Sequence, residues 1–91
     1  MYKKTVTIQN ATGLHARPAS DFIALAAKFK SYIVIRRKGG DEDDDANAKS
    51  IVNVLSLGLA QGEEVEIEAT GDDEKKAVDS LVDLINSKFG E

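Results

Sequence analysis

The chain has 91 residues, 42% of them hydrophobic and 31% charged, with a net charge of −4 at neutral pH. This length fits a single domain over residues 1–91, and the acidic balance disfavours nucleic-acid binding despite the basic stretch 36–38. The sequence contains no cysteine and no apolar run near the roughly 20 residues that a membrane span needs. We therefore expect a cytoplasmic protein without signal peptide, membrane insertion or disulfide.

The first half of the chain predicts two strands separated by a helix. Alternating apolar residues predict a strand over 3–8, which meets the turn-prone segment 10–13. Apolar residues at helical spacing, together with Pro18 in a position suited to a first turn, predict a helix over about 16–27. The alternation returns over 32–37 and predicts a second strand.

The second half predicts two more strands and two helices. Residues 46–48 fit a short edge strand, and 49–57 fit a helix. Segment 63–69 alternates acidic with apolar residues and predicts a strand with one face in the core. A turn with a helix N-cap candidate over 71–74 introduces a last helix, which is predicted to continue nearly to the C-terminus.

The predicted order is β-α-β-β-α-β-α. Strands that are apolar on one side only, combined with amphipathic helices, favour an α+β open-faced β-sandwich. We expect a four-stranded antiparallel sheet with three helices on one face.

His15 is the only histidine and lies in a polar, glycine-containing loop just before the first predicted helix. An imidazole can be neutral and nucleophilic near neutral pH. The N–H groups that open a helix favour an anion by roughly 0.3–1 kcal/mol, and Arg17 can add a charge-assisted hydrogen bond of about 1.5–3 kcal/mol. This pattern suits a phosphoryl group that is accepted and then released. A structural histidine is one alternative, and a metal site is a weaker one because only carboxylates remain as co-ligands.

The sequence contains two motifs, Gly13-Leu14-His15-Ala16-Arg17-Pro18-Ala19 and Lys49-Ser50-Ile51-Val52-Asn53-Val54-Leu55-Ser56-Leu57-Gly58. Together they resemble the HPr family, the histidine-containing phosphocarriers of the bacterial phosphoenolpyruvate-dependent sugar phosphotransferase system. The resemblance implies that His15 accepts a phosphoryl group from enzyme I and donates it to the IIA domains of sugar permeases. Arg17 and the backbone of Ala16 and Arg17 would bind the phosphate. It also implies a monomeric carrier, not a turnover enzyme, without metal or cofactor.

Ser50 matches the serine that many Gram-positive members of the family carry as a regulatory phosphosite. There, an HPr kinase/phosphorylase modifies it for carbon catabolite regulation. A phosphate adds about −1.5 to −2 charges, which favours Arg-bearing partners such as a catabolite-control transcription factor. The alternative is that Ser50 only caps the helix that follows.

The segment 51–55 has more apolar positions than one buried helix stripe needs, so part of it is expected to form an exposed docking patch. The resemblance likewise assigns partner binding to the surface around His15 and this helix. The predicted docking residues are Ile51, Val52 and Leu55, with Ser20 or Phe22 on the first helix.

Two features depart from the family pattern. Asn53 occupies a position where the family often has glycine, and the acidic segment 39–45 lengthens the chain between the two motifs. A solvated loop, electrostatic steering of partners and an ad hoc cation site at Asp41 to Asp45 are the alternatives for this segment. An EF-hand is rejected, because Ala46 and Val52 stand where it needs glycine and glutamate.

Two other functions compete with the sugar phosphocarrier. The first is a regulatory binding module controlled by Ser50 phosphorylation, in which His15 is silent. The second is a specialised phosphocarrier of a nitrogen- or dihydroxyacetone-related chain. Retention of both His15 and Arg17 favours a carrier, and the Lys49-Ser50-Ile51 pattern favours the sugar branch.

Overall fold

A computed structural model describes residues 1–39 and 45–90. Within these residues the helices and strands follow the predicted order, and a short 3₁₀ turn follows the last helix. The elements are β1 (Tyr2–Thr7), α1 (Ala16–Ala26), β2 (Tyr32–Arg37), β3 (Ala46–Asn47), α2 (Ile51–Ser56), β4 (Glu64–Thr70), α3 (Glu74–Asn86) and η2 (Lys88–Gly90). No helix in this described part is both long and apolar enough to cross a membrane.

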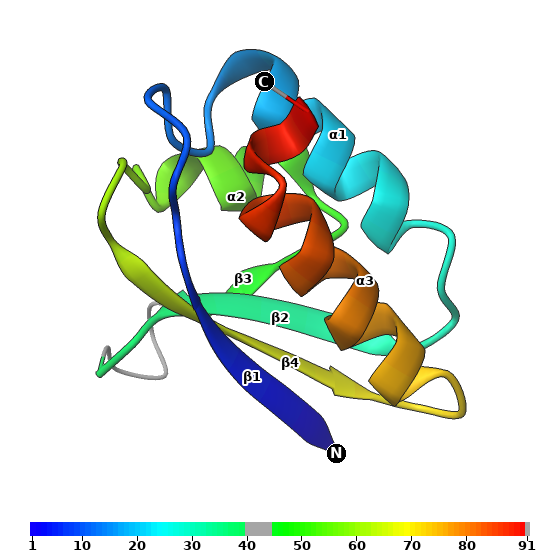
Figure 1. The fold of residues 1–91 in the computed structure, drawn as a ribbon. Helices are drawn as coiled ribbons and strands as arrows, with labels where there is room; N and C mark the ends of the chain where they lie inside the picture. The colour runs from blue at the N-terminus through cyan, green and yellow to red at the C-terminus, as the bar shows by residue number, and fades with distance from the viewer. Residues whose placement is uncertain (40–44, 91) are drawn as a thin grey trace.

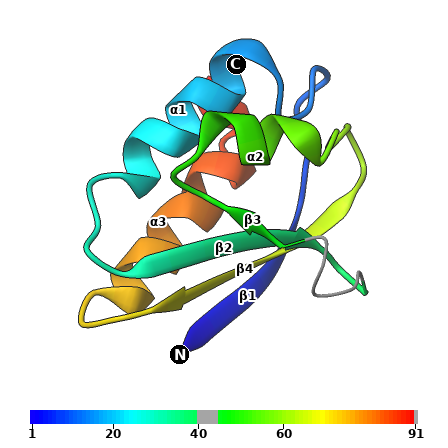
Figure 2. The same cartoon turned by 180° about the vertical axis from the view of Figure 1, so that it is seen from behind.

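The strands form one antiparallel sheet in the order β1-β4-β2-β3. β4 lies between β1 and β2, so its Ile67 has Lys4 as its partner on one side and Ile35 on the other. All three α-helices cover the same face of this sheet (Figures 1 and 2). The predicted open-faced β-sandwich is therefore confirmed.

Strand alternation decides which side chains enter the core. On β4, Val65, Ile67 and Ala69 are fully buried, whereas the half-buried Glu66 and Glu68 belong to the opposite face of the sheet. The apolar stripes of the two longer helices complete the core from above. Their buried residues are Pro18, Ala19, Phe22 and Ala26 on α1 and Ala77, Val78, Leu81 and Ile85 on α3.

The last helix ends earlier than its apolar spacing predicts. α3 stops at Asn86, and Lys88 and Phe89 both have a left-handed backbone with φ of 57°. This reversal returns Phe89 to the core, where it is 9% exposed. Apolar spacing alone does not distinguish a continued helix from a turn that buries the same side chain.

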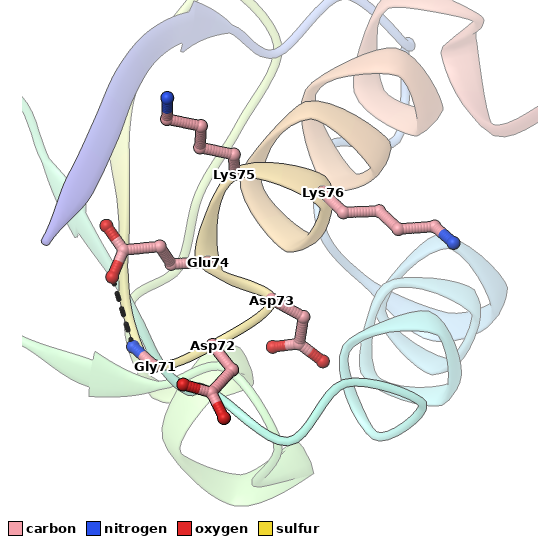
Figure 3. A pocket seen from close by; sticks show the side chains of 6 residues that line it. All are labelled: Gly71, Asp72, Asp73, Glu74, Lys75 and Lys76. Carbon is pink, nitrogen blue, oxygen red and sulfur yellow. Dashed lines mark hydrogen bonds between the residues drawn. The ribbon is translucent and has the colours of Figure 1, made fainter.

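The start of α3 is held to the loop that follows α1. Asp73 is in the N-cap position, but its side chain makes no capping hydrogen bond to the helix. Its carboxylate instead accepts from the backbone N–H groups of Lys30 at 2.8 Å and Ser31 at 3.0 Å. It also accepts from the Ser31 hydroxyl. The carboxylate of Glu74, the first residue of α3, accepts a hydrogen bond from the backbone N–H of Gly71 (Figure 3). Residues 71–76 line an open groove (Figure 3), which lies at the opposite end of the molecule from the start of α1 (Figures 1 and 2).

Candidate functional site

His15 stands immediately before α1 with its side chain exposed. Its backbone is extended, with φ −130° and ψ 159°, and its imidazole makes no capping hydrogen bond to the helix. The next residue, Ala16, has a left-handed φ of 51°. A non-glycine residue in this region costs of order 1–3 kcal/mol, so the surrounding chain must hold it there. The imidazole and the N–H groups of the first turn are thus both presented at the helix start.

The loop before His15 is fixed against the connection between α2 and β4. Gly13 has a φ of +67°, and a Cβ there would meet the Leu59 carbonyl oxygen and lie 2.9 Å from the Ala60 Cα. The next N–H, that of Leu14, donates to the Leu59 carbonyl at 3.0 Å. Only glycine combines this backbone with so close an approach. A side chain at position 13 would therefore displace the segment that carries His15.

The connection between α2 and β4 is itself held by hydrogen bonds to the side chains of Glu63 and Arg37. Glu63 accepts from the Ala60 N–H at 2.6 Å and from the Arg37 Nε at 2.8 Å, and Arg37 also donates to the Gly58 carbonyl. The Arg37 side chain and the Ala60 N–H together lower the pKa of Glu63. Near neutral pH the carboxylate is therefore charged and keeps both bonds.

Arg17 and Ser20 lie on the first turns of α1, and both are exposed. Within residues 1–39 and 45–90, Arg17 makes no hydrogen bond or ion pair, so its guanidinium remains available to an anion near His15. Phe22 on the same helix is fully buried. The suggestion that Phe22 docks a partner is therefore wrong, because its position on the apolar stripe turns it into the core.

α2 presents apolar side chains to solvent beside α1, against which it packs. Ile51 and Leu55 are each 40% exposed and Val52 is 72% exposed, whereas Val54 is fully buried. A single buried residue is enough to attach this short helix to the core. The three exposed side chains, which we call the α2 patch, thus lie on the helix next to the one that His15 precedes (Figure 2).

Ser50 is the N-cap of α2, with an extended backbone that starts the helix two residues later than the sequence predicts. Its Oγ accepts from the Asn53 N–H at 3.4 Å. The adjacent Lys49 donates from Nζ to the Phe29 carbonyl at 2.7 Å. Capping is therefore one role of Ser50, and Asn53 contributes its backbone N–H to the cap.

The basic stretch 36–38 forms ion pairs instead of a basic surface. Arg36 contacts Asp45 at 2.6 Å, Glu66 at 2.7 Å and Glu68 at 3.2 Å, and the guanidinium lowers the pKa of Asp45. Asp45 is thus paired and not simply solvated. The rest of the predicted acidic loop and cation site, residues 40–44, lies outside the described residues.

Asn10 is a buried residue of this region that the sequence did not single out. Its side chain is 2% exposed and bonds to the turn ahead of His15. Its place in a turn-prone segment is a signal for local structure only, because burial of an asparagine is not visible in the sequence.

The antiparallel sheet with an exposed histidine at the start of its first helix agrees with the class that the two sequence motifs predict, the small histidine phosphocarriers. Residues 2–87 match the family described as the PTS HPr component phosphorylation site. The chain therefore belongs to the HPr family, the phosphocarriers of the phosphotransferase system.

Relatives of two kinds support this assignment. The phosphocarrier protein HPr of Neisseria meningitidis is 40% identical over 91 residues, covering 100% of this chain and 98% of that protein. The phosphocarrier protein NPr of Escherichia coli is 39% identical over 89 residues, covering 98% and 96%. Among solved structures, HPr of Thermoanaerobacter tengcongensis is 49% identical with a TM-score of 0.91 over 100% of this chain and 98% of that one. A structure described as an HPr dimer from the same organism has a TM-score of 0.75 over 100% of both chains.

Proposed function

We propose that His15 carries the phosphoryl group, which it accepts from enzyme I and donates to IIA domains of sugar permeases. The observation that carries this proposal is the exposed, uncapped imidazole at the helix start, with the exposed Arg17 two residues further on. In the first transfer, a ring nitrogen attacks phosphorus as the bond between phosphorus and enzyme I breaks. The N–H groups of Ala16 and Arg17 and the Arg17 guanidinium would stabilise the transferred phosphate.

The α2 patch is proposed as the surface that docks both enzyme I and the IIA domains, together with Ser20. Its exposed apolar side chains support this role, because removing apolar surface from water is the main favourable term in most protein–protein association. We place the carrier in the cytoplasm and expect it to act as a monomer that forms short-lived complexes.

Ser50 is proposed as a second, regulatory phosphosite for an HPr kinase/phosphorylase. A phosphate there would stand beside Ile51 of the α2 patch and add charge to an apolar docking surface. Partners that rely on apolar contact would bind less well, whereas an Arg-bearing partner such as a catabolite-control transcription factor would bind better.

A nitrogen-related phosphotransferase chain is the second candidate for the partners of His15. The relatives named NPr favour it, because NPr of Escherichia coli is 39% identical over 98% of this chain, one percentage point below HPr of Neisseria meningitidis. The sugar branch remains our proposal on the Lys49-Ser50-Ile51 pattern. The two candidates share the chemistry at His15 and differ in the proteins that donate the phosphoryl group to it and accept the group from it.

Phosphoryl transfer from labelled phosphoenolpyruvate tests the proposal. With enzyme I of the sugar chain, the wild type should gain an acid-labile label that His15→Ala abolishes and Arg17→Ala slows. Undiminished label in His15→Ala would refute the carrier role of His15, and an equal rate in Arg17→Ala would remove Arg17 from the site. A parallel reaction with enzyme I of the nitrogen-related chain separates the branches, because the faster donor identifies the chain.

A further inference from the structure

Asn10 and Gly13 are joined by two hydrogen bonds that run in opposite directions. The side-chain Nδ2 of Asn10 donates to the backbone carbonyl of Gly13 at 2.8 Å. The backbone carbonyl of Asn10 accepts from the backbone N–H of Gly13 at 3.1 Å. The same Nδ2 also donates to the Thr12 Oγ1 at 3.1 Å. The amide side chain thus fixes the orientation of the Gly13 peptide from inside the turn 10–13.

The oxygen of the same side-chain amide, Oδ1, has no hydrogen-bond partner among the described residues. Asn10 Oδ1 is buried without a hydrogen bond, and within residues 1–39 and 45–90 it is the only such side-chain atom. A buried unpartnered acceptor destabilises a fold, and an apolar side chain of similar shape would avoid that cost. The unpartnered Oδ1 is thus a cost of asparagine at this position, whereas its Nδ2 makes a bond to the Gly13 carbonyl that no apolar side chain could make.

That target is connected directly to His15. Gly13 rests on the backbone of Leu59 and Ala60, and the following Leu14 is buried and donates its N–H to the Leu59 carbonyl. His15 is the next residue. In Figures 1 and 2 this loop after β1 lies beside the connection that leads from α2 to β4. The direction in which the chain leaves Gly13 therefore sets where the imidazole stands relative to α2.

We propose that Asn10 is a positioning residue for phosphoryl transfer at His15. It acts through the Gly13 carbonyl and does not touch the phosphoryl group. The proposal rests on the proposed function of His15, and it explains why a buried amide with one unpartnered oxygen occupies the turn. Docking through the α2 patch does not depend on it, so its loss should affect the transfer step more than binding.

The test uses Asn10→Ala and Asn10→Leu in the transfer assay with enzyme I. Asn10→Leu fills the same buried space without any polar atom, so it stays folded if Asn10→Ala leaves a damaging cavity. Both variants should lower kcat about tenfold or more with little change in KM, since a misplacement of 1 Å can cost about 100-fold. The matched control Thr12→Val removes only the Thr12 hydroxyl, the second acceptor of Asn10 Nδ2. This variant should accept the phosphoryl group at the wild-type rate.

A second readout separates positioning from general loss of stability. Amide hydrogen exchange of Leu14 should quicken in the Asn10 variants, but not in Ser31→Ala, which loses its bond to Asp73 at the far end of the molecule. Wild-type kcat in both Asn10 variants, or an equal kcat loss in Ser31→Ala, would overturn the proposal. Wild-type protein that gains no label at His15 would instead refute the proposed function, and the positioning role with it.

Discussion

At the scale of single residues, Ser50 combines a structural role with the proposed regulatory one. Its position before an apolar run predicts an N-cap, and the bond from the Asn53 N–H confirms this. The sequence also places His15 in a loop at a helix start, as the structure has it. The left-handed Ala16 and the buried Asn10 could not be predicted, because both depend on how the loop packs against a segment more than 40 residues away.

Replacing Ser50 separates its two roles. Ser50→Ala should lower the free energy of unfolding by about 0.5–2 kcal/mol through loss of the cap, measured by denaturant unfolding. It should also remove all acid-stable phosphate introduced by HPr kinase and ATP. Ser56→Ala, at the other end of α2, is the matched control and should keep full incorporation. Label that persists in Ser50→Ala, or a wild type that an active kinase does not label, would contradict the regulatory proposal.

At the scale of elements, α2 is attached to the core by one residue and leaves three large apolar side chains exposed. The sequence shows a surplus of apolar residues in this helix. It does not show which of them is buried, because four apolar residues among five consecutive positions define no single stripe. Because α2 packs against α1 and β3, Val54 is the residue that becomes buried.

Val52 and Val54 form a matched pair for testing this division. Val54→Ala should lower the free energy of unfolding by about 1.5–3 kcal/mol, because it removes buried methyl groups and leaves a cavity. Val52→Ala should change it by less than about 0.5 kcal/mol but raise the KM for transfer from enzyme I about threefold or more. Unfolding curves and transfer kinetics measure the two effects. If Val52→Ala leaves KM at the wild-type value, Val52 does not belong to the docking surface.

At the scale of the whole molecule, the binary pattern of the sequence predicts the element order and the open-faced sandwich, since β4, α1 and α3 each have one clear apolar face. Asp73 illustrates what such a pattern misses. The sequence suggests a helix cap in the segment 71–74, yet the Asp73 carboxylate bonds to the loop after α1. Polar contacts between distant segments leave no periodic signal, and the fold alone brings these two together.

The contact at Asp73 should make part of the stability depend on pH. The Ser31 hydroxyl, followed by the Lys30 N–H, lowers the pKa of Asp73, so the charged form stabilises the fold above the ordinary aspartate pKa of about 3.9. This contribution is lost as the pH falls through the lower pKa of the folded state. Asp73→Asn should therefore reduce Tm at about pH 7, with a deficit that shrinks at about pH 2.5. The exposed Asp72 provides the control Asp72→Asn, and an equal deficit at both pH values would contradict the account.

The central claim is that the phosphoryl group resides on the His15 imidazole. The most direct measurement is NMR of the ¹⁵N-histidine-labelled protein after reaction with phosphoenolpyruvate and enzyme I. We predict a phosphorus signal coupled to a ring nitrogen of His15, which disappears after brief acid treatment. An acid-stable phosphorus signal without nitrogen coupling, or an imidazole unchanged after complete reaction, would contradict the claim.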